Sequence, residues 1–192
     1  MSLDSQSETI LTNVYPEVSY RARKAIIQVR KETGMQMRIS DGARTFKKQN
    51  SLYLQAQKVT DALPGLSYHN YGMAIDACFV GTNPYLDLRE DQTQPNSPYI
   101  IAKAKQEELW SLWGRAVEEN GLRWGGRFPK ADNPHANILA SLSVREMKQI
   151  LEKAGIRAVW SAVDWLLGKS GSEWNSPNSV FFPLDPRTDQ GG

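Results

Sequence analysis

Residues 67–76 read SYHNYGMAID, and the apolar run continues to Val80. This run predicts a strand, and Gly72 permits a tight turn before it. His69 then lies in a loop and Asp76 lies within the strand, seven positions later. An imidazole nitrogen and a carboxylate oxygen are both ligands that zinc accepts. The stretch therefore predicts a strand that carries part of a metal site, although a surface histidine and a strand-end aspartate would give the same pattern.

A second polar segment contains WGG at residues 124–126 and DNPH at residues 132–135. His135 can supply a third ligand, and Asp132 can act as a general base toward water at the metal. Two neutral imidazoles and one carboxylate leave a bound Zn²⁺ positively charged, and such a metal lowers the pKa of its water to about 7. Asp132 could instead only open a turn, since Asp-Asn-Pro is a common turn sequence.

A third segment is GART at residues 42–45, which follows a predicted strand and precedes Gln49. Arg44 stands at a turn, where its guanidinium could reach a substrate carboxylate or a developing oxyanion. The alternative is an ordinary surface arginine.

The composition narrows the chemistry further. The 192 residues include one cysteine, Cys78, and two histidines. These counts exclude an intrachain disulfide, a cysteine-rich zinc finger and a three-histidine metal site. A formal net charge of +2 is too small to indicate a nucleic-acid or membrane surface. We therefore expect neither a nucleic-acid partner nor membrane insertion.

Hydrophobic periodicity predicts an α+β fold. Helices are expected over residues 16–34, 46–63, 99–120, 143–155 and 157–167, and strands over residues 35–40 and 74–80. Residues 81–98 are expected to form a long surface loop, and residues 122–134 a loop or short strand.

The apolar side chains are expected mainly in the core. Cys78 is expected to be a buried small apolar residue. Helical spacing predicts core positions for four tryptophans, namely Trp110, Trp113, Trp160 and Trp165. Phe181 and Phe182 are expected to pack the tail against the domain.

In order and spacing, these three segments resemble the motifs of the VanY-like zinc peptidases, over about residues 37–137. That family contains D-alanyl-D-alanine carboxypeptidases and L-alanyl-D-glutamate endopeptidases of peptidoglycan, including many phage endolysins. The resemblance implies these roles: Zn²⁺ ligands His69, Asp76 and His135; catalytic base Asp132; substrate or oxyanion contact Arg44; substrate-binding or supporting residues Ser67, Gln49 and Trp124. Ala43, Arg127 and the pair Ala136-Asn137 depart from the family pattern, which leaves the substrate preference open.

The resemblance also implies the fold shared by hedgehog domains and D-Ala-D-Ala peptidases, a small antiparallel sheet packed by helices. We expect a zinc peptidase domain over residues 1–168, with its motif core at about residues 37–139 and extra C-terminal helices within 140–168. Residues 169–192 are expected to form a Gly-, Ser- and Pro-rich tail. A monomer is expected.

The predicted function is hydrolysis of the peptidoglycan stem peptide at the L-Ala–D-Glu bond, with Zn²⁺ as cofactor. The alternatives are a D-alanyl-D-alanine carboxypeptidase and a non-catalytic zinc-binding module of the same fold. Met1 to Pro16 does not resemble a secretory signal. We therefore expect a phage or prophage endolysin that is made in the cytoplasm and reaches the cell wall or periplasm by holin-type release or from a virion.

Overall fold

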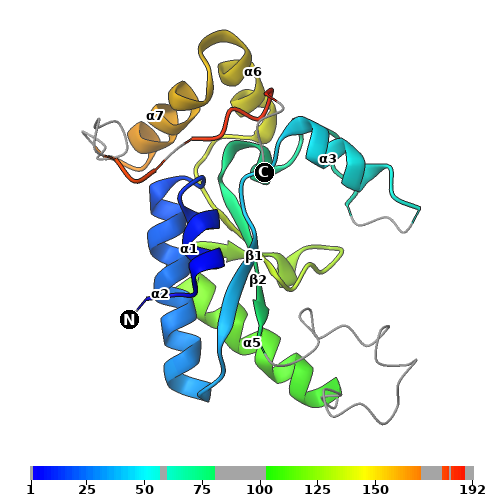
Figure 1. Ribbon diagram of the computed structural model, residues 1–192, viewed down its shortest axis with the longest axis vertical. Coiled ribbons are helices and arrows are strands. Elements are labelled where there is room, and N and C mark those ends of the chain that lie inside the picture. Colours follow the sequence, from blue (N-terminus) through cyan, green and yellow to red (C-terminus); the bar gives the residue numbers. More distant parts are fainter. Residues whose placement is uncertain (1, 57–59, 81–102, 170–178, 182, 189–192) are drawn as a thin grey trace.

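An antiparallel sheet forms the centre of the computed structural model, which describes residues 2–56, 60–80, 103–169, 179–181 and 183–188 (Figure 1). Within these residues the sheet has four strands: β1 (Met37–Asp41), β2 (Ala74–Phe79), β3 (Leu122–Trp124) and β4 (His135–Ile138). Their spatial order is β1-β2-β4-β3. The predicted α+β class with a small antiparallel sheet is confirmed.

Strand register brings distant polar residues together at one end of the sheet. Asp76 on β2 is paired with His135 on β4. On its other side, Asp76 is paired with Asp41 of β1, after a register shift that follows Ile39. Directly opposite residues in an antiparallel pair hold their side chains about 5 Å apart. The central position of β2 therefore assembles residues from three strands at one point.

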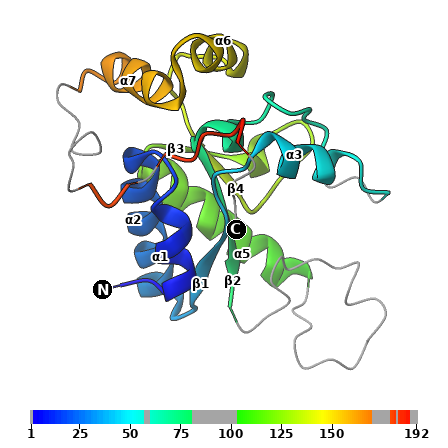
Figure 2. The same ribbon diagram turned by 45° about the horizontal axis from the view of Figure 1, so that its top comes forward.

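The helices of the described chain are α1 (Ser5–Leu11), α2 (Pro16–Thr33), α3 (Phe46–Tyr53), α5 (Lys103–Glu119), α6 (Val144–Ala154) and α7 (Ile156–Leu166). Two 3-10 turns, η1 (Tyr68–Tyr71) and η2 (Gly125–Arg127), lie beside the strands. Helices α2 and α5 run next to each other along one side of the sheet, and α3 projects from the other side (Figures 1 and 2). Helices α6 and α7 close one end of the molecule.

Local sequence signals explain where two helices begin and end. Pro16 opens α2, and Gly34 ends it with a φ of 72°, a conformation that glycine adopts without steric cost. Ser143 and Glu146 form the predicted capping box of α6. These predictions are confirmed.

Three predicted elements differ in length or lie partly outside the described residues. Helix α3 ends at Tyr53 instead of continuing to residue 63, and the buried Gln49 donates to the Ala62 carbonyl at 2.9 Å. The chain must therefore turn back after α3. The predicted loop over 81–98 and residues 99–102 of the predicted helix lie outside the described residues. Helix α1, which we did not predict, is capped by Asp4, whose carboxylate accepts from the Ser7 N–H at 3.0 Å.

Most of the predicted core is confirmed. Trp110, Trp113, Trp160 and Cys78 are buried. The prediction for Trp165 is wrong, because this residue is 79% exposed on the outer face of α7. Phe181 is partly buried against the core, and Phe182 lies outside the described residues.

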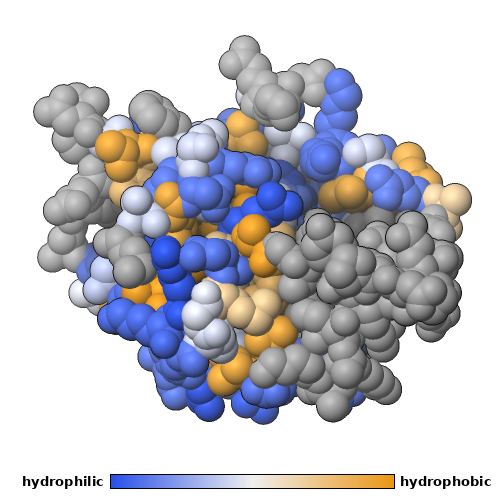
Figure 3. Space-filling view, turned by 60° about the horizontal axis from the view of Figure 1, so that its bottom comes forward, coloured by the Kyte–Doolittle hydropathy of each residue, from blue (hydrophilic) through white to orange (hydrophobic). Residues whose placement is uncertain are grey.

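Figure 3 brings forward the end of the molecule that lies at the bottom of Figure 1. Hydrophilic residues cover much of its described surface, with hydrophobic ones scattered among them. Among the helices that the structure describes, none combines the length and apolar character that a membrane span requires.

Candidate metal centre

Three potential metal ligands converge where β2 and β4 meet. The Nε2 atom of His69 lies 3.1 Å from Nδ1 of His135 and 3.3 Å from Oδ1 of Asp76. The third side of this triangle, from His135 Nδ1 to Asp76 Oδ1, measures 3.2 Å. Both histidines are buried and Asp76 is half-buried. The structure therefore brings together all three predicted ligands.

The triangle fits a small tetrahedral cation. Zinc binds histidine nitrogen and carboxylate oxygen at about 2.0–2.2 Å, and the edges of such a tetrahedron measure about 3.3 Å. The observed separations are 3.1–3.3 Å. Two nitrogens and one oxygen suit zinc, and three protein ligands leave a fourth position open. The residues present therefore fit a catalytic zinc site.

The turn η1 and the segment between β1 and α3 fix the orientation of His69. The Nδ1 atom of His69 lies 2.7 Å from the Gly42 carbonyl oxygen. Because a carbonyl can only accept, Nδ1 carries the proton and Nε2 keeps its lone pair for the metal. The backbone closes the same contact, since Arg44 N–H donates to the His69 carbonyl at 2.9 Å.

Gly42 has a steric role in this contact. A side chain there would begin 2.6 Å from Cγ2 of Ile10 and 3.0 Å from Cγ1 of Val14. Because α1 and the residues after it press against the backbone at this position, glycine lets the Gly42 carbonyl reach His69.

Arg44 lies behind the ligand Asp76. Its Nη2 donates to Asp76 Oδ2 at 2.6 Å, and its Nε donates to Asp41 Oδ2 at 2.8 Å. Because Arg44 binds Oδ2 of Asp76, the other oxygen, Oδ1, faces the two histidines. Burial by itself would raise the pKa of Asp76, but attraction from His69, hydrogen bonds with both histidines and the charge of Arg44 hold it well below its ordinary value. Asp76 is therefore a carboxylate at neutral pH.

His135 depends on the loop between β3 and β4. A side chain on Gly125 would begin 2.4 Å from the Asp132 carbonyl oxygen and 2.8 Å from Cβ of His135. The backbone can close there only with glycine, and the Asp132 N–H then donates to the Gly125 carbonyl at 3.0 Å. The ring of Phe128 lies 5.5 Å from the ring of His135.

Asp132 lies in the loop between β3 and β4, three residues before His135. The residue is exposed, and its backbone carbonyl accepts from the His135 N–H at 3.1 Å. The protein around its carboxyl raises the pKa through desolvation, and the negative charge of Asp76 raises it further, against the opposing pull of His135 and His69. A carboxyl beside the ligands with a raised pKa suits general base chemistry.

The three other predicted site residues support the backbone. Ser67 Oγ accepts from the His69 N–H at 3.3 Å and caps η1. Gln49 is fully buried and bonds to the segment at Thr60 and Ala62, as described above. The indole of Trp124 donates to the Asn133 carbonyl at 2.8 Å. Each of these contacts is internal to the protein.

Sequence reasoning missed two residues that hold the site. Asp41 binds Arg44, and its only sequence signal was the Asp41-Gly42 turn. The amide of Asn70 donates to the Arg44 carbonyl at 3.0 Å and accepts from the Gly65 N–H at 3.0 Å. Asn70 is buried beside His69, and a polar residue next to a predicted ligand was the signal that could have found it.

Comparisons with known proteins find similarity to peptidases of peptidoglycan. A family model described as D-alanyl-D-alanine carboxypeptidase matches residues 60–138, which include both histidines, Asp76 and Asp132. The chain is 29% identical over 145 residues to the peptidoglycan L-alanyl-D-glutamate endopeptidase CwlK of Bacillus subtilis strain 168. This alignment covers 70% of the chain and 78% of CwlK. The family model and the similarity to CwlK both agree with the resemblance of the chain to the VanY-like peptidases.

A search of solved structures matches the L-Ala D-Glu endopeptidase ChiX of Serratia marcescens. The similarity covers 71% of the present chain and 89% of ChiX, with 19% sequence identity and a TM-score of 0.45. The family match ends at residue 138, before α6 and α7.

Proposed function

We propose that this chain is a zinc-dependent peptidase that hydrolyses the peptidoglycan stem peptide at the L-Ala–D-Glu bond. The observation that carries the proposal is the triangle of His69, Asp76 and His135, whose charges act on the nearby Asp132 carboxyl group. The bond is inferred from CwlK, whose name specifies it and whose similarity spans most of both chains.

The residues of the site divide the work. When bound, Zn²⁺ supplies a Lewis acid that polarises the peptide carbonyl and acidifies water. Asp132 accepts the proton of the attacking water and returns it to the leaving amine. Asp76 keeps its negative charge because His69, His135 and Arg44 hold its pKa low, and Asp41 in turn accepts a hydrogen bond from Arg44. Arg44 thus acts through Asp76, while the predicted contact between Arg44 and substrate stays a prediction.

The second candidate is a D-alanyl-D-alanine carboxypeptidase, favoured by the description of the family model. The two reactions release different products. The carboxypeptidase removes one terminal D-alanine from the stem peptide, whereas the endopeptidase separates the stem peptide from its L-alanine. A non-catalytic zinc module is disfavoured by Asp132, since a structural zinc needs no general base. The phage or prophage origin, the holin-type route and the monomeric state stay predictions.

A digest of purified muropeptides by the zinc-loaded protein, followed by mass spectrometry, tests the proposal. We expect fragments from cleavage after L-alanine. Loss of only the terminal D-alanine would favour the carboxypeptidase instead. Intact stem peptides with fully metal-loaded protein would overturn both.

Asp132→Asn separates catalysis from metal binding. We expect this variant to keep stoichiometric zinc and to lose about 10²- to 10⁴-fold in kcat, the usual contribution of a general base. Because the base must be ionised, the rate of the wild type should rise as the pH rises through the Asp132 pKa, and the variant should lack this rise. Loss of zinc from Asp132→Asn would make Asp132 a ligand. Asp61→Asn, on an exposed loop, is the matched control.

A further inference from the structure

We infer that the C-terminal part of the chain, residues 144–166 and 183–188, positions the metal ligand His69 and the start of α3, and so belongs to the scaffold of the active site. The inference rests on the proposed function, because it concerns the same metal site. It goes beyond the family match, which ends at residue 138. Two separate contacts carry it.

The first contact joins α7 to the turn that holds His69. Trp160 is fully buried, and its indole N–H donates to the Tyr71 carbonyl at 2.8 Å. Tyr71 is the last residue of η1. A side chain on Gly72 would begin 3.2 Å from Cζ2 of Trp160, so the indole lies directly against the end of the turn.

This contact matters because η1 is short. A single 3-10 turn has few internal hydrogen bonds and weak hydrogen-bond geometry, so its orientation depends on its neighbours. Helix α7 is itself anchored, since the Tyr15 hydroxyl donates to the buried Asp164 carboxylate. The backbone N–H of the same tyrosine donates to the carbonyl of Gly72, the residue after η1, at 2.9 Å. Trp160 therefore ties the His69 turn to an anchored helix.

The second contact joins the tail to α3. The tail runs from the α7 side of the molecule back toward α3 in both views (Figures 1 and 2). The buried Pro186 accepts through its carbonyl from the Phe46 N–H at 2.7 Å. Phe46 is the first residue of α3, where helix N–H groups have no partner within the helix. Arg44 stands two residues before it, so the tail helps to fix the backbone that carries Arg44.

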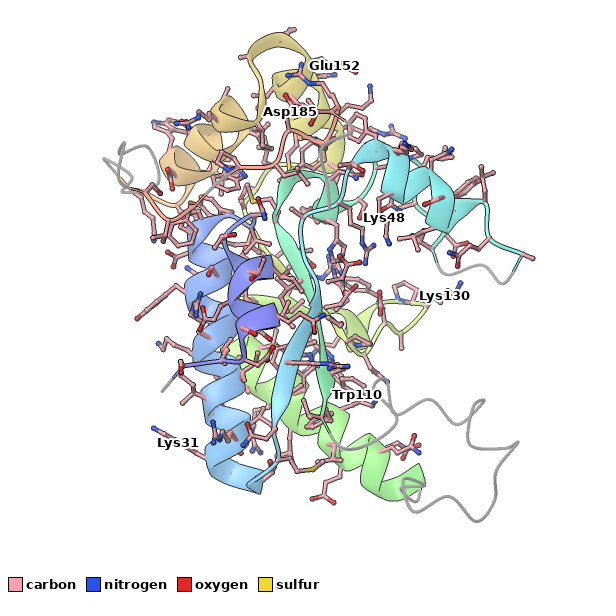
Figure 4. All side chains as sticks on the ribbon, in the orientation of Figure 1. Lys31, Lys48, Trp110, Lys130, Glu152 and Asp185 are labelled. Carbon is pink, nitrogen blue, oxygen red and sulfur yellow. The ribbon has the colours of Figure 1, made fainter. Side chains whose placement is uncertain are left out.

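Arg187 holds the tail in this place. Its Nη1 donates to the Leu151 carbonyl on α6 at 3.2 Å, and its guanidinium pairs with Asp185. Figure 4 places Asp185 beside α6, close to Glu152. Helix α6, the tail and α3 are thus joined in series.

Trp160→Phe tests the first contact, because it removes the indole N–H and keeps an aromatic ring. Trp165→Phe on the exposed face of the same helix is the matched control. Zinc affinity is measured by chelator competition on folded protein, well below the melting temperature, together with the absorption spectrum of the Co²⁺-substituted site. We expect Trp160→Phe to bind zinc about 3- to 10-fold more weakly, the effect of one lost hydrogen bond, and to change the Co²⁺ spectrum. Trp165→Phe should match the wild type.

Arg187→Ala tests the second contact and also decides the matter if Trp160→Phe does not fold. Arg145→Ala, exposed on α6, is its control. We expect Arg187→Ala to weaken zinc binding at least about twofold, with Arg145→Ala unchanged. Lower melting temperatures with unchanged zinc affinity and an unchanged Co²⁺ spectrum in both test variants would overturn the inference and leave the proposed function intact. A wild type that takes up no zinc would overturn both.

Discussion

His69 and His135 occupy opposite halves of the metal site, and the protein holds their rings by different means. The ring of His69 is tied through Nδ1 to the Gly42 carbonyl, and its backbone is bonded to Ser67 and Arg44. For His135, the constraint comes from a tight turn that only Gly125 can close and from the ring of Phe128. Hydrogen bonds orient one ligand, and close packing orients the other.

The difference predicts two kinds of sensitivity. The half with His69 contains a chain of polar partners, Asp41, Arg44 and Asn70, so a change of charge or of a donor should alter the metal site there. The half with His135 leaves no room for a side chain at Gly125. An added methyl group there should therefore be enough to alter the metal site. Lys48 on α3 and Lys130 in the loop after β3 mark these halves in Figure 4, where both lie on the same side of the sheet.

The largest effects should come from the ligands, whichever way each is held. His69→Ala and His135→Ala should each lower zinc affinity by more than about 100-fold, because even partners of the ligands typically contribute 10- to 100-fold. Zinc content after dialysis measures this loss of affinity. Asp76→Ala, which removes a predicted ligand, and Asp61→Ala, which does not, form a matched pair. A variant of either histidine that retained one equivalent of zinc would remove that residue from the ligand set.

Gly125→Ala tests the packed half. The new methyl group meets backbone oxygen, which cannot move aside as a flexible side chain can. We expect a loss of about 1–3 kcal/mol in the free energy of unfolding, typical of overpacking, and a lower kcat because the Asp132–His135 turn shifts. Gly34→Ala is the control, with a φ of 72° and open space around it. It should cost about 1 kcal/mol through backbone strain and leave kcat unchanged.

Arg44→Lys tests the hydrogen-bonded half. Lysine keeps the charge but cannot donate to Asp41 and Asp76 in the fixed geometry of a guanidinium. We expect zinc affinity to fall about tenfold, as for other outer partners of a metal ligand. A raised KM with unchanged zinc affinity would instead assign Arg44 to the substrate. Arg127→Lys, in an exposed ion pair, should change neither quantity.

The smallest effect should come from the support of α1, which packs against Gly42. The hydrogen bond from Arg23 is the main cause of the lowered pKa of Glu8. A carboxyl whose pKa is lower in the folded state stabilises the fold above its unfolded pKa of about 4.3, and this stabilisation is lost as the pH falls through the folded pKa. Because the pair is partly exposed, Glu8→Gln should lower the free energy of unfolding by less than about 1 kcal/mol at pH 7.

Denaturant unfolding at several pH values measures this difference between wild type and Glu8→Gln. The two should converge only as the pH falls below the folded pKa of Glu8, where position 8 is neutral in both proteins. A difference that persisted at low pH would mean that Glu8 acts through packing.

The elements nearest the site were readable from the sequence because their signals are local. Alternating and continuous apolar runs predicted β1 and β2, and capping residues predicted the ends of α2 and α6. Helix α3 was overestimated because its apolar pattern continues past Tyr53, while the buried amide of Gln49 requires the chain to return. Trp165 was misplaced because helical spacing does not state how wide the buried face of α7 is.

By itself, the sequence determined which residues could hold a metal. His69 and His135 are its only two imidazoles, and the carboxylate of Asp76 follows His69 by seven residues, within a predicted strand. The tertiary structure alone decided how they meet. The register of β2 against β4 places Asp76 opposite His135, and that pairing depends on contacts between residues far apart in the chain. The sequence likewise showed Arg44 only as a cation available for substrate. Its hydrogen bond to Asp76 is decided by the fold. A charged residue in a motif indicates which chemistry is available. Its partner depends on which side chains the fold brings within hydrogen-bond distance.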